Sequence, residues 1–204
     1  MTEIMDVIKK LRAGAKKRNF PQTFDLIVVL KEVDIRKPEN RINESLTLPH
    51  GKGKDAKIAI FSDEIKESGV EIVNSKTIAV LGKDRRRAKK LVRKIDFFLA
   101  EPKLMPIIGK NLGQFLAPRG KMPRVITGDV KTLVENLKKS IRIRLKDSPV
   151  IQCPVGVENM EDEKIAENIK AVLNFLEEKL PKGKGNIKKI LLKLTMSKPI
   201  TIKV

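Results

Sequence analysis

A short polar segment near the end of the chain, residues 195–199, carries the side chains best suited to binding. Four consecutive positions supply two hydroxyls, a thioether and an ammonium group, from Thr195, Met196, Ser197 and Lys198, and Pro199 follows. Apolar residues alternate with others on both sides of this segment, which predicts two strands that share one core. Proline fixes its own φ and holds the preceding residue extended, so a turn is expected between the strands. On geometry alone an ordinary hairpin turn is the simpler interpretation, and a binding role requires a partner that suits this surface.

Residues that catalyse reactions or bind metals are sparse. His50 is the single histidine and Cys153 the single cysteine, so neither a catalytic dyad nor a cluster of metal ligands is supported. Residues 49–54 resemble a phosphate loop only weakly, because Asp55 follows the last lysine and a strand is expected next. No Gly-x-Gly-x-x-Gly follows a predicted strand. We therefore expect no metal and no cofactor, and the lone cysteine fits a reducing cytoplasm without an internal disulfide.

The charge balance indicates a polyanionic partner. The 204 residues contain 44 Lys and Arg against 25 Asp and Glu, a formal net charge of +19. Such an excess suggests nucleic acid or an anionic membrane surface. No apolar run approaches the roughly 18 residues of a spanning helix, and the start lacks a signal-peptide core, so no membrane segment is expected. The chain has no Trp or Tyr and seven Phe, so base stacking cannot be its general mode of binding.

The two ends of the chain predict an α+β domain with an antiparallel sheet and packed helices. The apolar period of residues 4–15 indicates an amphipathic helix whose other face is basic, which is usually only solvated. Residues 24–30 form a strand with Thr23 and Phe24 at its entrance. A phenylalanine at such a place is most often a core residue. A long helix with an apolar stripe between residues 165 and 180 precedes the closing strands.

A basic row is expected on one strand of this domain. Residues 141–146 alternate three apolar side chains with Arg142, Arg144 and Lys146. A turn at residues 147–149 follows, and residues 150–155 return as a second strand. The pattern predicts a hairpin with its basic row facing outward.

The middle of the chain alternates strands and helices. Strands are expected at residues 57–61, 70–73 and 95–100, and helices at residues 62–69, 84–94 and 104–116 and from residue 129 onward. The helix at residues 84–94 is very basic. This order predicts an α/β Rossmann-like domain with a largely parallel sheet.

The simplest architecture is one domain inserted into another. Residues 1–51 and 141–204 would form the outer α+β domain, and residues 52–140 the inserted α/β domain, with a hinge at the crossings near Gly51 and Ser140. The inserted part has 21 Lys and Arg against 10 Asp and Glu, and the outer part has 23 against 15. Net charge alone therefore does not choose which domain binds the polyanion.

Four separated motifs resemble one known family. They are Arg-Lys-Pro-Glu-Asn-Arg-Ile at 36–42, Leu-Pro-His-Gly-Lys-Gly-Lys at 48–54, Ala-Pro-Arg-Gly-Lys-Met-Pro at 117–123 and Leu-Thr-Met-Ser at 194–197. In order and spacing they resemble protein one of the large ribosomal subunit, in its archaeal form, over nearly the whole chain. Ala117 and Ser197 stand where that family usually has glycine.

The resemblance implies a two-domain, non-enzymatic protein that binds large-subunit ribosomal RNA at a mobile side stalk. It further implies release of deacylated tRNA from the exit site, repression of the protein's own messenger RNA, a ribosomal location in the cytoplasm and a monomer off the ribosome. The main RNA surface is expected on the outer domain. Its expected residues are Thr23, Phe24, Arg41, Arg142, Arg144, Lys146, Thr195, Met196, Ser197 and Lys198.

Two other functional classes remain open at this stage. An α/β enzyme acting on nucleic acid or nucleotides would also be basic, but the chain lacks a His/Cys cluster and a Lys-Ser phosphate loop. A general DNA-binding architectural protein is disfavoured because no repeat or helix-turn-helix pattern is present.

Overall fold

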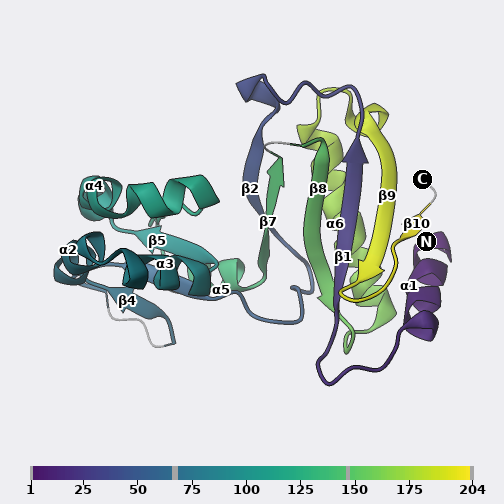
Figure 1. Ribbon diagram of the computed structural model, residues 1–204, viewed down its shortest axis with the longest axis horizontal. Coiled ribbons are helices and arrows are strands. Elements are labelled where there is room, and N and C mark those ends of the chain that lie inside the picture. Colours follow the sequence, from purple (N-terminus) through teal and green to yellow (C-terminus); the bar gives the residue numbers. More distant parts are fainter. Residues whose placement is uncertain (1, 66–68, 146–147, 203–204) are drawn as a thin grey trace. The chain divides into compact units, whose positions relative to one another are not determined.

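The computed structural model describes residues 2–65, 69–145 and 148–202, which form a mixed structure of helices and sheets (Figure 1). The chain divides into two compact units. The first combines Met1–Asp55 with Lys139–Val204, and the second is Ala56–Lys138. Each unit is described by itself.

An antiparallel four-stranded sheet forms the centre of the first unit. Its spatial order is β10 (Ile200–Ile202), β9 (Ile187–Leu194), β1 (Thr23–Leu30) and β8 (Val150–Val157). Alternate side chains of β1 are buried, as its period of two requires. Phe24, Leu26 and Val28 are fully buried. Each such side chain stabilises the fold by about 1.5–3 kcal/mol relative to an exposed one.

Two helices cover the buried face of this sheet. α1 (Thr2–Gly14) contributes Ile8 and Leu11, and α6 (Asp162–Lys179) contributes Ile165, Ile169 and Val172 to the same core. α1 packs against α6, β9 and β10. The short 3₁₀ helix η4 (Gly183–Asn186) leads from α6 into β9.

β2 (Ile42–Thr47) and β7 (Ser140–Leu145) form a separate antiparallel pair in the first unit, after the 3₁₀ helix η1 (Pro38–Asn40). The sequence predicted instead a hairpin of residues 141–146 with residues 150–155, and that prediction is wrong. β7 pairs with β2, and β8 pairs with β1. Turn residues indicate where the chain reverses direction. Which strand each segment then pairs with depends on segments that are remote in sequence.

The second unit contains a parallel sheet in the order β4 (Glu71–Val73), β3 (Ile58–Phe61), β5 (Phe97–Ala100) and β6 (Arg124–Val125). All side chains of β3 and β5 are buried, as expected for parallel strands covered on both faces. α2 (Ser75–Lys83), α3 (Arg85–Lys94) and α4 (Met105–Leu116) share one core with Phe61 and Phe98. α5 (Val130–Lys138) covers the other face, where it packs on Ile60 and Leu99.

Two helix predictions in the second unit need correction. Residues 62–65 begin the helix expected at 62–69 but are not helical, and residues 66–68 lie outside the described part. The Ser62 hydroxyl accepts hydrogen bonds from the backbone N–H groups of Glu64 and Ile65, as an N-cap does, although residues 62–65 themselves are not helical. Helix α2 was not predicted; it has only nine residues and buries only Ile78 and Leu81. Two 3₁₀ helices, η2 (Pro102–Leu104) and η3 (Ala117–Arg119), flank α4.

Candidate nucleic-acid interface

The turn after β9 is anchored to the start of β1 by one threonine. The Thr195 Oγ1 accepts a hydrogen bond from the Thr23 backbone N–H at 3.0 Å and donates to the Thr23 carbonyl at 3.4 Å. The two strands are neighbours, with Phe24 opposite Leu194. The Thr195 hydroxyl therefore holds the turn in place, and the fold brings two of the expected site residues, Thr23 and Thr195, side by side.

Ser197 closes the same turn from within. Its backbone N–H donates to the Leu194 carbonyl at 3.0 Å, and its hydroxyl accepts from the Leu194 N–H at 2.8 Å. Among the described residues, Glu32 is the only non-glycine with positive φ, so Ser197 adopts an ordinary backbone conformation. A serine therefore fits where the resemblance expects glycine, and its hydroxyl caps the strand end.

Met196 projects from this anchored turn into solvent, with 60% of its surface exposed. Its backbone N–H donates to the side-chain oxygen of Gln22 at 3.2 Å. Gln22 is buried; its side-chain amide donates to the Lys16 carbonyl, and its backbone N–H donates to the Glu158 carboxylate. A buried amide thus fixes the backbone that presents an exposed apolar side chain.

A basic hollow of about 460 Å³ lies beside the turn. Met196, Ser197 and Lys198 line one side of it, and Lys10, Lys16 and Arg18 supply further positive charge from α1 and the segment after it. These three cations were not among the expected site residues, because basic residues on and beside a surface helix are usually only solvated. The basic face of residues 4–15 could have pointed to Lys10, but Lys16 and Arg18 follow that stretch. Only the fold brings all three beside residues 196–198.

A second hollow of about 780 Å³ also involves Thr23. Phe20, Lys52 and Lys54 line it, and Phe20 is 47% exposed. Gly53 in the same segment has φ +77, and a Cβ there would lie 2.0 Å from the Val157 side chain. The Gly-Lys-Gly-Lys segment is therefore fitted closely against the end of β8 and is not a free phosphate loop.

Phe24 lies beneath the turn and not on the surface. Its side chain is fully buried in the core, and the guanidinium of Arg12 sits 5.5 Å from the centre of its ring. Arg12 also donates to the Asp162 carboxylate at 2.7 Å and to the carbonyls of Glu158 and Met160. In this structure Phe24 and Arg12 support the turn region from below, and nothing in the sequence distinguishes Arg12 from the other cations of the first helix.

The other described cations of the expected site lie on or just before the β2–β7 pair, a sheet separate from the one that carries the turn. β7 ends at Leu145, near the start of β8, and the first residue of β8, Val150, pairs with Val29 at the far end of β1. Phe24 and Val29 are five residues apart, roughly 17 Å along the strand. Arg142 and Arg144 lie across from Ser45 and Asn43 on the β2–β7 pair, and exposed Arg41 precedes β2. Lys146 lies outside the described residues.

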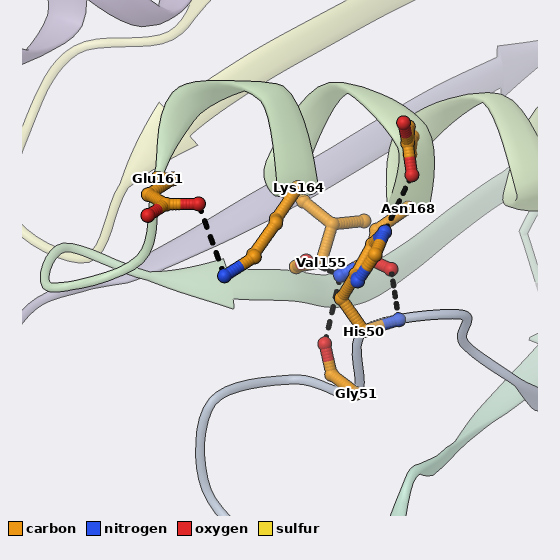
Figure 2. A network of polar contacts seen from close by, with 7 residues as sticks. His50, Gly51, Val155, Glu161, Lys164 and Asn168 are labelled. Carbon is orange, nitrogen blue, oxygen red and sulfur yellow. Dashed lines mark hydrogen bonds and ion pairs between the residues drawn. The ribbon is translucent and has the colours of Figure 1, made fainter.

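A buried asparagine organises the first chain crossing, as Figure 2 shows. Asn168 on α6 is fully buried; it donates to the carbonyls of Gly51 and Val155 and accepts from the His50 backbone N–H. The His50 ring contacts the Glu167 carboxylate. The single histidine is thus part of a structural network that ties residues 50–51 to α6 and β8.

The described residues offer little for catalysis. No group of three or more His, Cys, Asp or Glu among them could hold a metal ion. Burial, and to a lesser extent the nearby Asp25 carboxylate, raise the pKa of Cys153 to about 12, so the thiol stays protonated and unreactive at neutral pH. None of the described helices has the length and apolarity to cross a bilayer.

Comparison with known proteins gives a consistent result. The model of the Ribosomal protein L1p/L10e family matches residues 9–198. The Large ribosomal subunit protein uL1 of Thermococcus kodakarensis is 43% identical, over 98% of this chain and 96% of that protein. The protein of the same name from Methanocaldococcus jannaschii is 44% identical, over 98% of this chain and 94% of that protein. The anchored turn, the basic hollow and the four motifs therefore occur in a chain that belongs to the Ribosomal protein L1p/L10e family.

Proposed function

We propose that this chain is a structural protein of the large ribosomal subunit and binds ribosomal RNA through the surface around residues 195–198. Family membership confirms the resemblance drawn from the motifs and sets aside the enzyme and DNA-architectural alternatives. The observation that carries the proposed site is the exposed Met196 on a backbone-anchored turn beside a basic hollow.

The surface suits folded RNA for physical reasons. Structured RNA is recognised largely by its shape and by contacts to its backbone and 2′-hydroxyls. Met196 and the Thr195–Ser197 backbone supply a small, rigid, shaped contact. Lys10, Lys16, Arg18 and Lys198 supply phosphate affinity that weakens with salt. Phe24 contributes to this surface indirectly, because its buried side chain stabilises the sheet beneath the turn.

The finer parts of the proposal concern the ribosome. The RNA partner is the large-subunit ribosomal RNA of the mobile side stalk, and the protein contributes to release of tRNA from the exit site and represses translation of its own messenger RNA. Residues 1–51 and 141–204 act as the RNA-binding domain, and residues 52–140 as an inserted domain that moves about the crossings near Gly51 and Ser140. Off the ribosome the protein is a monomer. Arg41, Arg142 and Arg144 form a separate basic contact for the same RNA.

The test is to titrate the Met196→Ala variant against the large-subunit ribosomal RNA and a scrambled RNA of equal length. Loss of an apolar contact buried in the complex should weaken specific binding by about 1–3 kcal/mol. Val80→Ala is the matched control, because Val80 is 54% exposed on α2, in the second unit. The proposal fails if Met196→Ala keeps full affinity and selectivity while its melting temperature is unchanged.

A further inference from the structure

Among the described helices, α3 (labelled in Figure 1) has the highest proportion of Lys and Arg, and nothing in the proposed site uses it. Seven of its ten residues are Arg or Lys, none is acidic, and all seven are exposed: Arg85, Arg86, Arg87, Lys89, Lys90, Arg93 and Lys94. Arg87 pairs with Asp84, and Lys94 pairs with Glu71. Within the described part of the chain, the other five make no ion pair.

This charge works against the stability of the helix. Three arginines occupy its first turn, where the positive end of the helix dipole repels cations. Like charges also face each other four residues apart, as in Arg86 with Lys90 and Lys89 with Arg93. A solvated surface helix selected for stability would interleave acids at these positions. The cations of α3 therefore destabilise the helix in the free protein, and a bound anion would relieve their mutual repulsion.

Both ends of the helix are secured against this repulsion. The Asp84 carboxylate accepts hydrogen bonds from the backbone N–H groups of Arg86 and Arg87 at 2.9 and 3.1 Å. The Lys121 ammonium donates to the carbonyls of Val92 and Ile95 at 2.9 and 2.5 Å. Ala88, Leu91 and Val92 fix the apolar side in the core. The exposed cations thus lie on a helix that is capped at both ends and packed against the core on one side.

The chemistry of the face selects among anionic partners. Its apolar residues are all buried, so it presents no apolar edge that could enter a lipid bilayer, as interfacial helices do. Residues four apart on a helix are roughly 6 Å apart along its axis, a spacing comparable with that of successive phosphates on a nucleic-acid strand. The guanidinium group of an arginine can donate hydrogen bonds to two oxygens of one phosphate at the same time.

We propose that the exposed face of α3 is a second RNA-binding surface, which binds the phosphate backbone and makes no sequence-specific contact with the bases. It rests on the proposed ribosomal RNA-binding function and adds a contact on the second unit. Arg86, Lys90 and Arg93 form its central stripe, at i, i+4 and i+7. Phosphate contacts of this kind position a protein on RNA and add affinity, but they carry no sequence preference.

The test compares two full-length triple variants. Arg86→Gln/Lys90→Gln/Arg93→Gln removes the stripe. Lys76→Gln/Lys110→Gln/Lys131→Gln removes the same charge from exposed positions scattered over α2, α4 and α5. Each is titrated over a salt series against large-subunit ribosomal RNA and a scrambled RNA of equal length. Neutralising the stripe should lower the slope of log K against log salt by about 2 on both RNAs, and leave the affinity ratio between them unchanged.

The scattered variant should change that slope by less than half as much. Arg86→Lys/Arg93→Lys keeps the charge and should keep most of the slope. The stripe variant should melt no lower than the unaltered protein, because it relieves repulsion. Equal slope changes in the two triple variants overturn this inference. If the unaltered protein shows no preference for ribosomal over scrambled RNA, the proposed function fails, and the slope on scrambled RNA still decides the role of α3. Absence of binding to either RNA overturns both.

Discussion

The turn at residues 195–198 and helix α3 are both basic surfaces, but they are built in opposite ways. Around the turn, hydrogen bonds from Thr195, Ser197 and Gln22 fix the backbone, and an apolar side chain projects from it. On α3 the backbone is an ordinary helix, and the surface is defined by exposed cations, five of which make no ion pair with any other described residue. A fixed shape discriminates between partners, whereas a dense charge mainly adds affinity that salt removes. We therefore expect selectivity on the first unit and non-selective affinity on the second.

The largest effect should come from separating the two units. A polypeptide that joins residues 1–55 to 139–204 through a short Gly/Ser linker should fold, because its core of α1, α6 and the four-stranded sheet is complete. It should retain most of the preference for large-subunit ribosomal RNA over a scrambled RNA. Residues 56–138 alone should bind both RNAs weakly and equally. Titrations at two salt concentrations measure this, and selectivity in residues 56–138 would reverse our assignment.

A smaller effect should follow from releasing the turn without changing its exposed side chain. Thr195→Val removes the hydroxyl that bonds to both backbone groups of Thr23. Unmade hydrogen bonds of this kind cost about 1–3 kcal/mol, and we expect specific RNA affinity to fall by a comparable amount as Met196 loses its fixed position. Thr195→Ser keeps the hydroxyl and is the matched control. Full affinity in Thr195→Val together with a loss in Thr195→Ser would mean that the methyl group, not the anchor, matters.

How much of this was visible in the sequence differs between the two regions. The α3 cations were evident, because helical period and charge are local properties. The position of residues 195–199 between two strands was also evident from alternation. Their anchoring was not, since it depends on Gln22 and Thr23, more than 170 positions away. The link between α1 and the turn depends on packing in the same way, as does the pairing of β7 with β2.

Two of the motifs that carry the family resemblance also support the fold. In the Ala-Pro-Arg-Gly-Lys-Met-Pro motif, Lys121 caps α3, and Gly120 takes a left-handed conformation with φ 64. In the Leu-Pro-His-Gly-Lys-Gly-Lys motif, Asn168 holds residues 50 and 51. Such residues are recognisable by their motif, but a linear pattern does not say whether their polar groups face a ligand or the protein itself.

Removing one support should therefore affect stability and leave selectivity intact. Asn168→Ala leaves buried carbonyls of Gly51 and Val155 without their donor, which we expect to lower the free energy of unfolding by about 1–3 kcal/mol. Glu167→Gln alters only the more exposed side of the network and should cost less than about 1 kcal/mol. Chemical denaturation measures both. A variant at Asn168 that stays fully stable yet loses RNA selectivity would place this network in the RNA site.

The smallest expected effect contrasts two carboxylates, one in each unit, through their pH dependence. Burial raises the pKa of Asp25 above its usual value, against a weaker opposing effect of Lys193. Hydrogen bonds from the Thr132 side chain and backbone lower the pKa of Asp129. A raised carboxyl pKa means that ionised Asp25 disfavours the folded state at neutral pH. This penalty disappears as the pH falls below about 3.8, the usual pKa of the group. Asp25→Asn should therefore stabilise the protein at pH 7, by less than about 1 kcal/mol because the group is half exposed, and should give no gain near pH 3.

Asp129→Ala should do the opposite. It should lower the melting temperature at pH 7, and this effect should be lost as the pH falls and the Asp129 carboxyl group of the unaltered protein is protonated. Melting temperatures of the three proteins between pH 3 and 7 test both signs, and a destabilising Asp25→Asn at pH 7 would show that the attraction to Lys193 outweighs the cost of burial.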